Sequence, residues 1–290
     1  MAQNPAMRMH VFLLGLGLAL AVAACAERRG DLDASGTAPD PAAAKRGEYL
    51  YIAGNCSGCH GKGEGGRALA TGFGTFYSRN ITPDPAHGIG RWSERDFVRA
   101  LRDGVSPEGE YYYPAFPFTA FTGMSDGDLR DLRAYLVTLP PSPAANKPPD
   151  TIVPRGTMAI WRGFYFSPGP LVPDATHDAA WNRGAYLANA VAHCGECHTP
   201  RDMLGGLEKG RAFAGGKLGD TSGKFAPNLT PAHLGAWKAG DFATVLETGM
   251  KPDGDFVAKP MSEVVDSTSK LTQADRRAIA AYLKSLPPRD

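Results

Sequence analysis

Four of the five cysteines of the chain lie in two copies of one pentapeptide, Cys-x-x-Cys-His. In this type of motif the two thiols form thioethers with the vinyl groups of haem, and the adjacent histidine becomes the proximal iron ligand. A zinc site would need a second pair of ligands, and a redox dithiol belongs in a strand–helix context that is absent here. The motifs therefore predict two covalently bound haem c groups. Their residues are Cys56, Cys59 and His60 in the first copy, and Cys194, Cys197 and His198 in the second.

The segments that must position these motifs also occur twice, in the same order, which indicates a tandem duplication. Each copy has Arg-Gly-x-Tyr-Leu before the motif and Asn-x-Thr-Pro after it. A tryptophan, a glycine and a closing Ala-Tyr-Leu follow in each. The corresponding pairs are 46–50 and 183–187, 80–83 and 228–231, Trp92 and Trp237, Gly104 and Gly249, and 134–136 and 281–283.

Each unit is predicted to be mostly helical. The closing helices show apolar residues at the i, i+3, i+4, i+7 spacing of one buried helical face. Capping boxes are predicted at their starts, Ser125 with Asp128 and Thr272 with Asp275, and Leu-Pro-Pro sequences end them. A shorter helix is predicted from near Ser93 to before Gly104, with a counterpart that ends before Gly249.

Small residues in the first helix of each unit predict a close helix crossing. We expect the helix that carries Gly47 to cross the closing helix near Tyr135, and the helix that carries Gly184 to cross near Tyr282. A glycine allows two helices to approach closely while a tyrosine fills the adjoining space.

The amino terminus is predicted to direct secretion. In residues 1–25, Arg8 precedes an apolar run that ends in small residues and is short for a membrane span. Cys25 follows Val-Ala-Ala, which resembles a lipobox, so a lipid anchor on Cys25 is expected, with ordinary cleavage as the alternative. Residues 26–42 are polar and are predicted to be a flexible tether.

The net charge of the whole chain, +1, argues against nucleic acid as a partner.

The repeated pattern resembles the class I cytochrome c fold, present twice. The expected fold is therefore all-α, with domains at 43–142 and 179–290 and a docked segment at 143–178 between them. More closely, the chain is similar to diheme cytochromes c related to the cytochrome subunits of periplasmic alcohol and gluconate dehydrogenases. The likeness rests on residues 80–84, 88–92, 113–118 and 193–201. Those subunits carry three haem motifs and this chain has two, so the dehydrogenase partner does not carry over with the fold.

The resemblance implies methionine as the usual sixth iron ligand. Met261 fits this role in the second domain, with Met250 and Met203 as rivals. The first domain has no methionine at the matching position near residue 116. Met124 is favoured there, with His87, a vacant position or another ligand as alternatives.

Trp92 and Trp237 occupy matching positions, where the resemblance implies hydrogen bonds from the indole N–H to a haem propionate. Arg91 could add a charge-assisted contact to the first haem. Ordinary core packing of the tryptophans is the alternative.

Electron transfer is the expected function, with two six-coordinate haems and no catalysis. The expected donor is a periplasmic dehydrogenase, and the expected acceptor is another cytochrome or a terminal oxidase. A peroxidase-like or thiosulfate-oxidising diheme enzyme is the alternative. The known thiosulfate type uses a cysteine ligand, and no cysteine remains for that role because Cys25 belongs to the leader.

Overall fold

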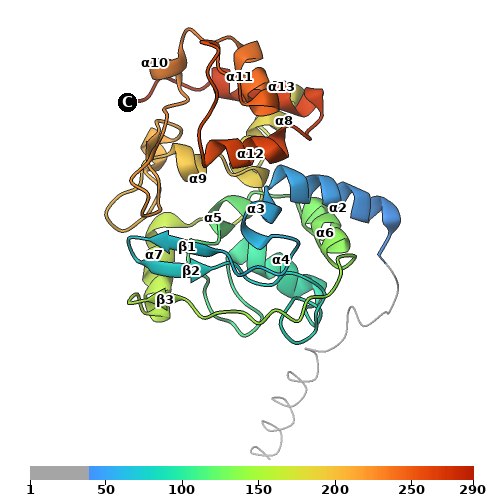
Figure 1. The fold of residues 1–290 in the computed structure, drawn as a ribbon. Coiled ribbons are helices and arrows are strands. Elements are labelled where there is room, and N and C mark those ends of the chain that lie inside the picture. Colours follow the sequence, from blue (N-terminus) through green and yellow to red (C-terminus); the bar gives the residue numbers. More distant parts are fainter. Residues whose placement is uncertain (1–38) are drawn as a thin grey trace, which may run out of the picture. The chain divides into compact units, whose positions relative to one another are not determined.

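Two helix pairs, one in each repeat, form the main packing units of the protein (Figure 1). The first pair is α2 (Pro41–Ala53) with α6 (Asp126–Leu136), and the second is α8 (Ala179–Tyr186) with α13 (Gln273–Lys284). The computed structural model describes residues 39–290. The predicted leader, Cys25 and residues 26–38 of the predicted tether lie outside the described residues. Asp40 caps the first described helix, which begins at Pro41, so the last two residues of the predicted tether are helical. No helix in the described part of the chain has the length and apolarity needed to cross a membrane.

The first repeat and the segment that follows it contain most of the strands. The first-repeat elements are α2 (Pro41–Ala53), α3 (Cys56–His60), β1 (Ala68–Thr71), β2 (Gly74–Tyr77), α4 (Glu94–Asp103), α5 (Phe118–Phe121) and α6 (Asp126–Leu136). The connecting segment contains β3 (Asp150–Thr151), a 3₁₀ turn (Arg155–Thr157) and α7 (Met158–Tyr165).

The second repeat follows the same order with shorter strands. Its elements are α8 (Ala179–Tyr186), a π-helical turn (Leu187–Val191), α9 (Gly195–His198), a 3₁₀ turn (Lys209–Arg211), β4 (Gly216–Lys217), β5 (Phe225–Ala226), α10 (Pro231–Leu234), α11 (Ala239–Thr248), α12 (Met261–Thr268) and α13 (Gln273–Lys284).

The expectation of an all-α fold is only partly met, because the mostly helical protein also contains two small sheets. β1, β2 and β3 form an antiparallel sheet in that order, with Leu69 opposite Phe76 and Gly74 opposite Thr151. β4 and β5 form an antiparallel pair. These strands lie in the long stretches after the haem motifs, where extended backbone satisfies its N–H and C=O groups by pairing.

The predicted helix crossings are present in both repeats. A Cβ at Gly47 would lie 1.8 Å from the Asp131 carbonyl oxygen and 2.8 Å from the Cβ of Tyr135. A Cβ at Gly184 would lie 1.9 Å from the Ala278 carbonyl oxygen. Asp131 and Ala278 each lie one helical turn before the predicted tyrosine, so the closest approach is slightly earlier in the closing helix than expected.

The predicted capping boxes of the closing helices are only half formed within each repeat. Ser125 Oγ accepts the Asp128 N–H at 3.1 Å, and Thr272 Oγ1 accepts the Asp275 N–H at 3.1 Å. The second contact of a capping box, from the backbone N–H of the cap residue to the carboxylate, is present in α4, where Asp96 accepts from the Ser93 N–H at 3.1 Å. This direct contact is not formed in α6 and α13. In α6 and α13 a tyrosine hydroxyl from the other repeat lies between the carboxylate and the backbone N–H.

The helix ends predicted before Gly104 and Gly249 are confirmed, since both glycines directly follow their helices, α4 and α11, in a left-handed conformation.

The two tyrosines that complete these caps come from equivalent positions. Tyr49 donates to Asp275 at 2.6 Å and accepts the Thr272 N–H at 3.1 Å. Tyr186 donates to Asp128 and accepts the Ser125 N–H at 3.1 Å. The interface between the repeats is therefore reciprocal: the first helix of each repeat completes the cap of the closing helix of the other.

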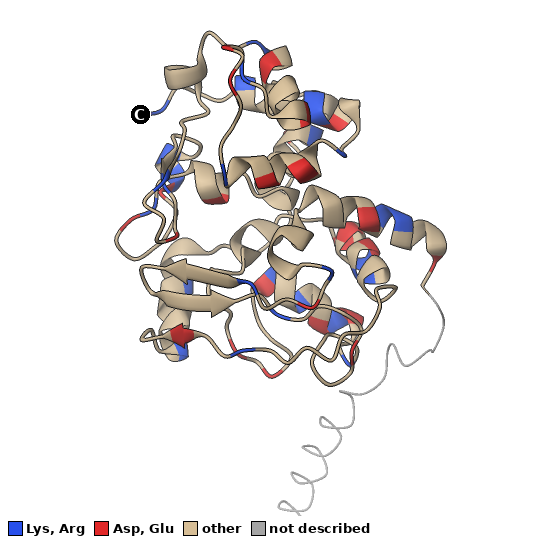
Figure 2. Cartoon of the chain, in the orientation of Figure 1, with Lys and Arg blue, Asp and Glu red and all other residues tan. Residues whose placement is uncertain are grey.

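The connecting segment packs against both repeats. Tyr113 donates to the Val153 carbonyl at 2.7 Å, which ties the segment to the first repeat. In α7, Trp161 donates to the Leu204 carbonyl at 3.0 Å and Tyr165 donates to Asp202 at 2.6 Å, which ties it to the second. Figure 2 shows that acidic and basic residues are interspersed along the helices of both repeats.

Candidate haem sites

Each haem motif begins at a sharp change of backbone direction. Asn55 and His193, the residues before the first cysteines, have φ values of 47° and 42°. Short helices follow at α3 and α9, which place the two cysteines and the histidine of each motif in a single turn. None of the four motif cysteines is paired in a disulfide. The arrangement fits haem c, because both thiols and the histidine can reach one macrocycle.

Backbone carbonyl groups orient His60 and His198, the predicted proximal histidines. His60 Nδ1 donates to the Arg79 carbonyl at 2.7 Å, and His198 Nδ1 donates to the Pro227 carbonyl at 2.9 Å. Burial lowers the pKa of both imidazoles, more strongly than these hydrogen bonds raise it. A neutral imidazole whose Nδ1 carries the proton presents Nε2 as the free ligand atom. This is the form that an iron site requires.

The repeated Asn-x-Thr-Pro sequence builds the turn that supplies these carbonyls. Asn80 is buried and accepts from the N–H and the hydroxyl of Thr82 at 2.9 and 2.7 Å. Its amide also donates to the Ser142 carbonyl at 2.8 Å. Asn228 makes the equivalent contacts with Thr230, at 2.8 and 2.7 Å. The sequence analysis found this repeat but did not indicate its role. In the structure the repeat forms a turn directly after the carbonyl that contacts the histidine of each haem motif.

Cys56 and Cys194, the first cysteines of the two motifs, are half-buried and pack against the core. Burial raises the pKa of the Cys56 thiol and of the Cys194 thiol to about 12. Before haem is attached, these thiols are neutral and apolar, which suits a pocket that receives an apolar ring. These two predicted attachment residues therefore bring no charge to the core.

The methionines differ sharply in exposure. Met124 is 2% exposed, and Met261 is half-buried and packs against the core. Met250 is 41% exposed and Met203 is 93% exposed, so these two rivals lie at the surface. Met124 follows His60 by 64 residues and Met261 follows His198 by 63. His87 is half-buried in a turn, where its backbone N–H donates to the Asp84 carboxylate at 2.7 Å.

The residues expected at the propionates are partly buried tryptophans and one exposed arginine. Trp92 and Trp237 pack against the core. The ring of Trp237 meets that of Phe242 edge to face, with the ring centroids 5.2 Å apart. Among the described residues, no side chain or carbonyl accepts a hydrogen bond from either indole N–H. Arg91 is exposed. The indoles are thus available as donors, while the contact proposed for Arg91 has no structural support beyond its neighbouring position.

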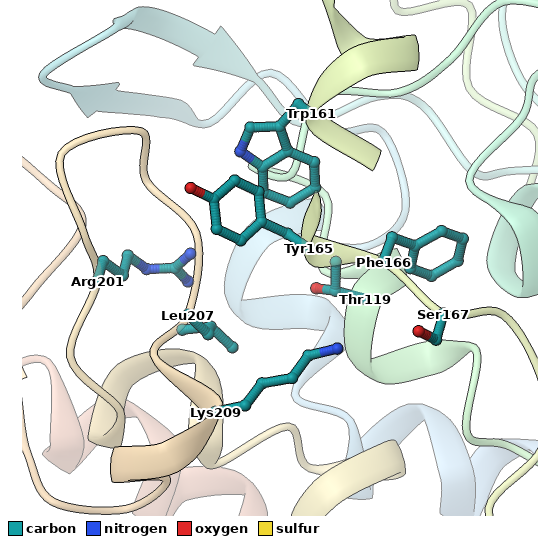
Figure 3. A pocket seen from close by; sticks show the side chains of 8 residues that line it. All are labelled: Thr119, Trp161, Tyr165, Phe166, Ser167, Arg201, Leu207 and Lys209. Carbon is teal, nitrogen blue, oxygen red and sulfur yellow. The ribbon is translucent and has the colours of Figure 1, made fainter. Parts of the chain in front are cut away.

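A polar network around the second motif was not predicted. Glu196, the variable residue before Cys197, accepts from Thr119 of the first repeat at 2.6 Å and from Arg201 at 2.5 Å. Thr119 and Arg201 line a small cavity with the aromatic residues of the connecting segment (Figure 3). Figure 3 shows Arg201 and Lys209 reaching into it from the second repeat. Nothing in a Cys-x-x-Cys-His pattern signals that a variable position forms a contact between repeats.

Comparisons with known proteins match both repeats to cytochrome families. Residues 182–287 match the family model for cytochrome c, and residues 42–136 match the model for cytochrome c oxidase, cbb3-type, subunit III.

Relatives among characterised proteins differ in length from this chain. A diheme cytochrome c-type protein of Cereibacter sphaeroides is 44% identical over 84% of this chain and 86% of its own. The fructose dehydrogenase cytochrome subunit of Gluconobacter japonicus is 40% identical over 87% of this chain. The quinone alcohol dehydrogenase cytochrome c subunit of Gluconobacter oxydans is 39% identical over 86%. The chain spans about half the length of these two dehydrogenase subunits, 55% of each.

The match to the diheme relative extends over nearly the whole of both proteins, and each repeat holds one haem motif in a turn that fits the group. The chain therefore belongs to the diheme cytochrome c family and carries two covalently bound haem c groups, one in each repeat.

Proposed function

We propose that the protein is an electron carrier whose two irons are each bound by a histidine and a methionine. His60 and Met124 serve the first haem, and His198 and Met261 the second. The observation that carries this proposal is the burial of Met124, at 2% exposure, in the same repeat as His60, whose Nδ1 is bonded to a carbonyl and leaves Nε2 for the iron. A buried thioether in a protein of this family favours a filled sixth position over an open one.

Haem c supplies a one-electron iron couple when bound. The chain's own residues hold that couple in place and set its potential. The Arg79 and Pro227 carbonyls fix the imidazoles, and the thioether sulfur of methionine favours reduced iron. The proposed propionate donors are Trp92 and Trp237. The cysteines Cys56, Cys59, Cys194 and Cys197 are the proposed attachment residues.

Contact between the two motif turns supports transfer between haems within one chain. His193 Nε2 lies 3.3 Å from the Gly54 carbonyl, and these residues precede the first cysteines of their motifs by one and two positions. Two haems attached to turns that touch can exchange electrons without a diffusing partner. A single chain can thus accept an electron at one haem and release it at the other.

The proposed donor is a dehydrogenase, because several relatives are named as cytochrome subunits of fructose, alcohol and gluconate dehydrogenases. The proposed acceptor is another cytochrome or a terminal oxidase. We place the protein in the periplasm, held at the membrane by lipid on Cys25, on the basis of the leader sequence. A Cys25→Ser variant that remains on membranes would contradict the lipid anchor.

The ligand assignment is tested by replacing each methionine in the haem-loaded protein. Met124→Ala and Met261→Ala should each abolish the iron–sulfur charge-transfer band of one haem and lower its midpoint potential. Met250→Ala is the matched control, because Met250 is 41% exposed, and should leave both haems unchanged. A wild-type protein with an open iron that turns over hydrogen peroxide would overturn the carrier proposal in favour of a peroxidase.

A further inference from the structure

Tyr186 belongs to the second repeat, but its hydroxyl lies at the start of the closing helix of the first. It accepts the backbone N–H of Ser125 at 3.1 Å and donates to the Asp128 carboxylate. Ser125 directly follows Met124 in the chain. The hydroxyl therefore holds the backbone one residue from the proposed ligand of the first haem.

Other groups from outside the first repeat hold the residues just before Met124. The Leu171 N–H donates to the Gly123 carbonyl at 2.9 Å, and the Gly169 N–H donates to the Thr122 hydroxyl at 2.8 Å. Gly123 also packs against Ala190 of the second repeat, where an added Cβ would lie 2.9 Å from the Ala190 Cβ. The backbone on both sides of Met124 is thus positioned by the connecting segment and the second repeat.

The Tyr186 hydroxyl is suited to act as a fixed donor. Burial and the hydrogen bond to Asp128 raise its pKa, so it stays protonated under ordinary conditions. A hydrogen bond to a carboxylate stabilises the folded arrangement more than a hydrogen bond between two neutral groups does. The contact also lies at the amino-terminal end of α6, where the helix dipole favours the Asp128 charge.

We propose that Tyr186 is a positioning residue for the first haem: by holding Ser125 and Asp128, it keeps Met124 at the sixth coordination position. The inference rests on the proposed ligation of the first iron by Met124. A residue of the second repeat would then determine how firmly methionine is held at the iron of the first.

The duplication supplies a matched control. Tyr49 makes the same two contacts at the start of α13, with Thr272 and Asp275. The residue before Thr272 is Leu271, and Met261 lies on a different helix, α12. Loss of the Tyr49 hydroxyl therefore removes an equivalent interface contact without touching a residue adjacent to a proposed ligand.

The experiment measures how readily added imidazole displaces methionine from each haem in the full-length, haem-loaded protein. Met124→Ala first identifies the charge-transfer band that belongs to the first haem. Tyr186→Phe should then lower the imidazole concentration needed for half-displacement at that haem about tenfold, as expected for loss of one hydrogen bond to a charged group. Asp128→Ala should act in the same direction.

The control and the ligand variant separate the outcomes. Tyr49→Phe should leave displacement at the first haem within about twofold of wild type. Equal effects of Tyr49→Phe and Tyr186→Phe at the first haem would show general loosening of the interface and overturn the proposal. An unchanged first haem in Tyr186→Phe would also overturn it, while the ligand assignment would stand if Met124→Ala removes the band. If Met124→Ala leaves both bands intact, the ligand assignment fails and the positioning role fails with it.

Discussion

Replacing Gly47 with alanine should strongly destabilise the first repeat. The new Cβ would lie 1.8 Å from the Asp131 carbonyl oxygen, 2.6 Å from its carbonyl carbon and 2.8 Å from the Cβ of Tyr135. Cβ atoms essentially never come within 3.0 Å of a heavy atom from another part of the chain, so α2 and α6 must separate by more than about 1 Å. Overpacking of this kind costs about 1–3 kcal/mol, and the backbone clash places Gly47→Ala at or above the upper end of that range.

The free energy of unfolding, measured for the haem-loaded protein by urea titration with circular dichroism, tests this magnitude. Gly163→Ala is the matched control, because Gly163 lies within α7 and no atom lies within 4 Å of the Cβ that it would gain. Removing a helical glycine there should stabilise the protein by up to about 1 kcal/mol. A Gly47→Ala protein whose unfolding free energy lies within about 0.5 kcal/mol of wild type would refute the close crossing.

Two further predictions concern the interface and the proximal side. Burial would raise the pKa of Asp275, but hydrogen bonds from Arg183 and Tyr49 outweigh it and hold the pKa below its usual value. The stability that Asp275 contributes is therefore complete above about pH 4 and is lost as the pH falls through the lowered pKa. Asp275→Asn should unfold more easily in urea at pH 7, by a margin that shrinks on acidification; a margin independent of pH would contradict this. Asn80→Ala should cost about 1–3 kcal/mol, because buried groups lose their partners. It should also shift the midpoint potential of the first haem alone, because the Arg79 carbonyl beside His60 loses its support; two unchanged potentials would show that the turn does not orient His60.

Local features of the sequence predicted the parts of the fold that depend on one repeat at a time. The haem motifs, the helix ends at Gly104 and Gly249, and the crossings at Gly47 and Gly184 all follow from spacing and residue size within a unit. Each repeat provides an independent copy of the evidence. The small sheets were missed, because β1 and β2 are only four residues each and lack a long alternating pattern.

The contacts between repeats could not be predicted in the same way. Tyr49 and Tyr186 occupy helical positions typical of an apolar core, and nothing local indicates that their hydroxyl groups reach another helix cap. The complete capping box was the natural expectation for Ser125 and Asp128, because their spacing is the same in both arrangements. Only the packing of one repeat on the other determines whether the carboxylate bonds the cap directly or through a tyrosine.

The two repeats contact each other differently near the two proposed methionine ligands, although both repeats arose from one unit. Near Met124 the contact between repeats is a tyrosine hydroxyl bonded to a backbone N–H and a carboxylate. The helix that begins at Met261 contacts the first repeat through a hydrogen bond from Ser267 Oγ to Asn55 Oδ1 at 2.9 Å. It also forms an ion pair, in which Arg67 Nη2 lies 3.1 Å from Glu263 and the two side chains are 48% and 33% exposed. Exposed ion pairs contribute about 0–1 kcal/mol, whereas loss of a hydrogen bond to a charged group costs about 1.5–3 kcal/mol. The backbone next to Met124, the proposed sixth ligand of the first haem, is therefore held by a contact with the second repeat that has no counterpart next to Met261 in the described part of the chain. We expect loss of the Tyr186 contact to change the potential of the first haem before that of the second.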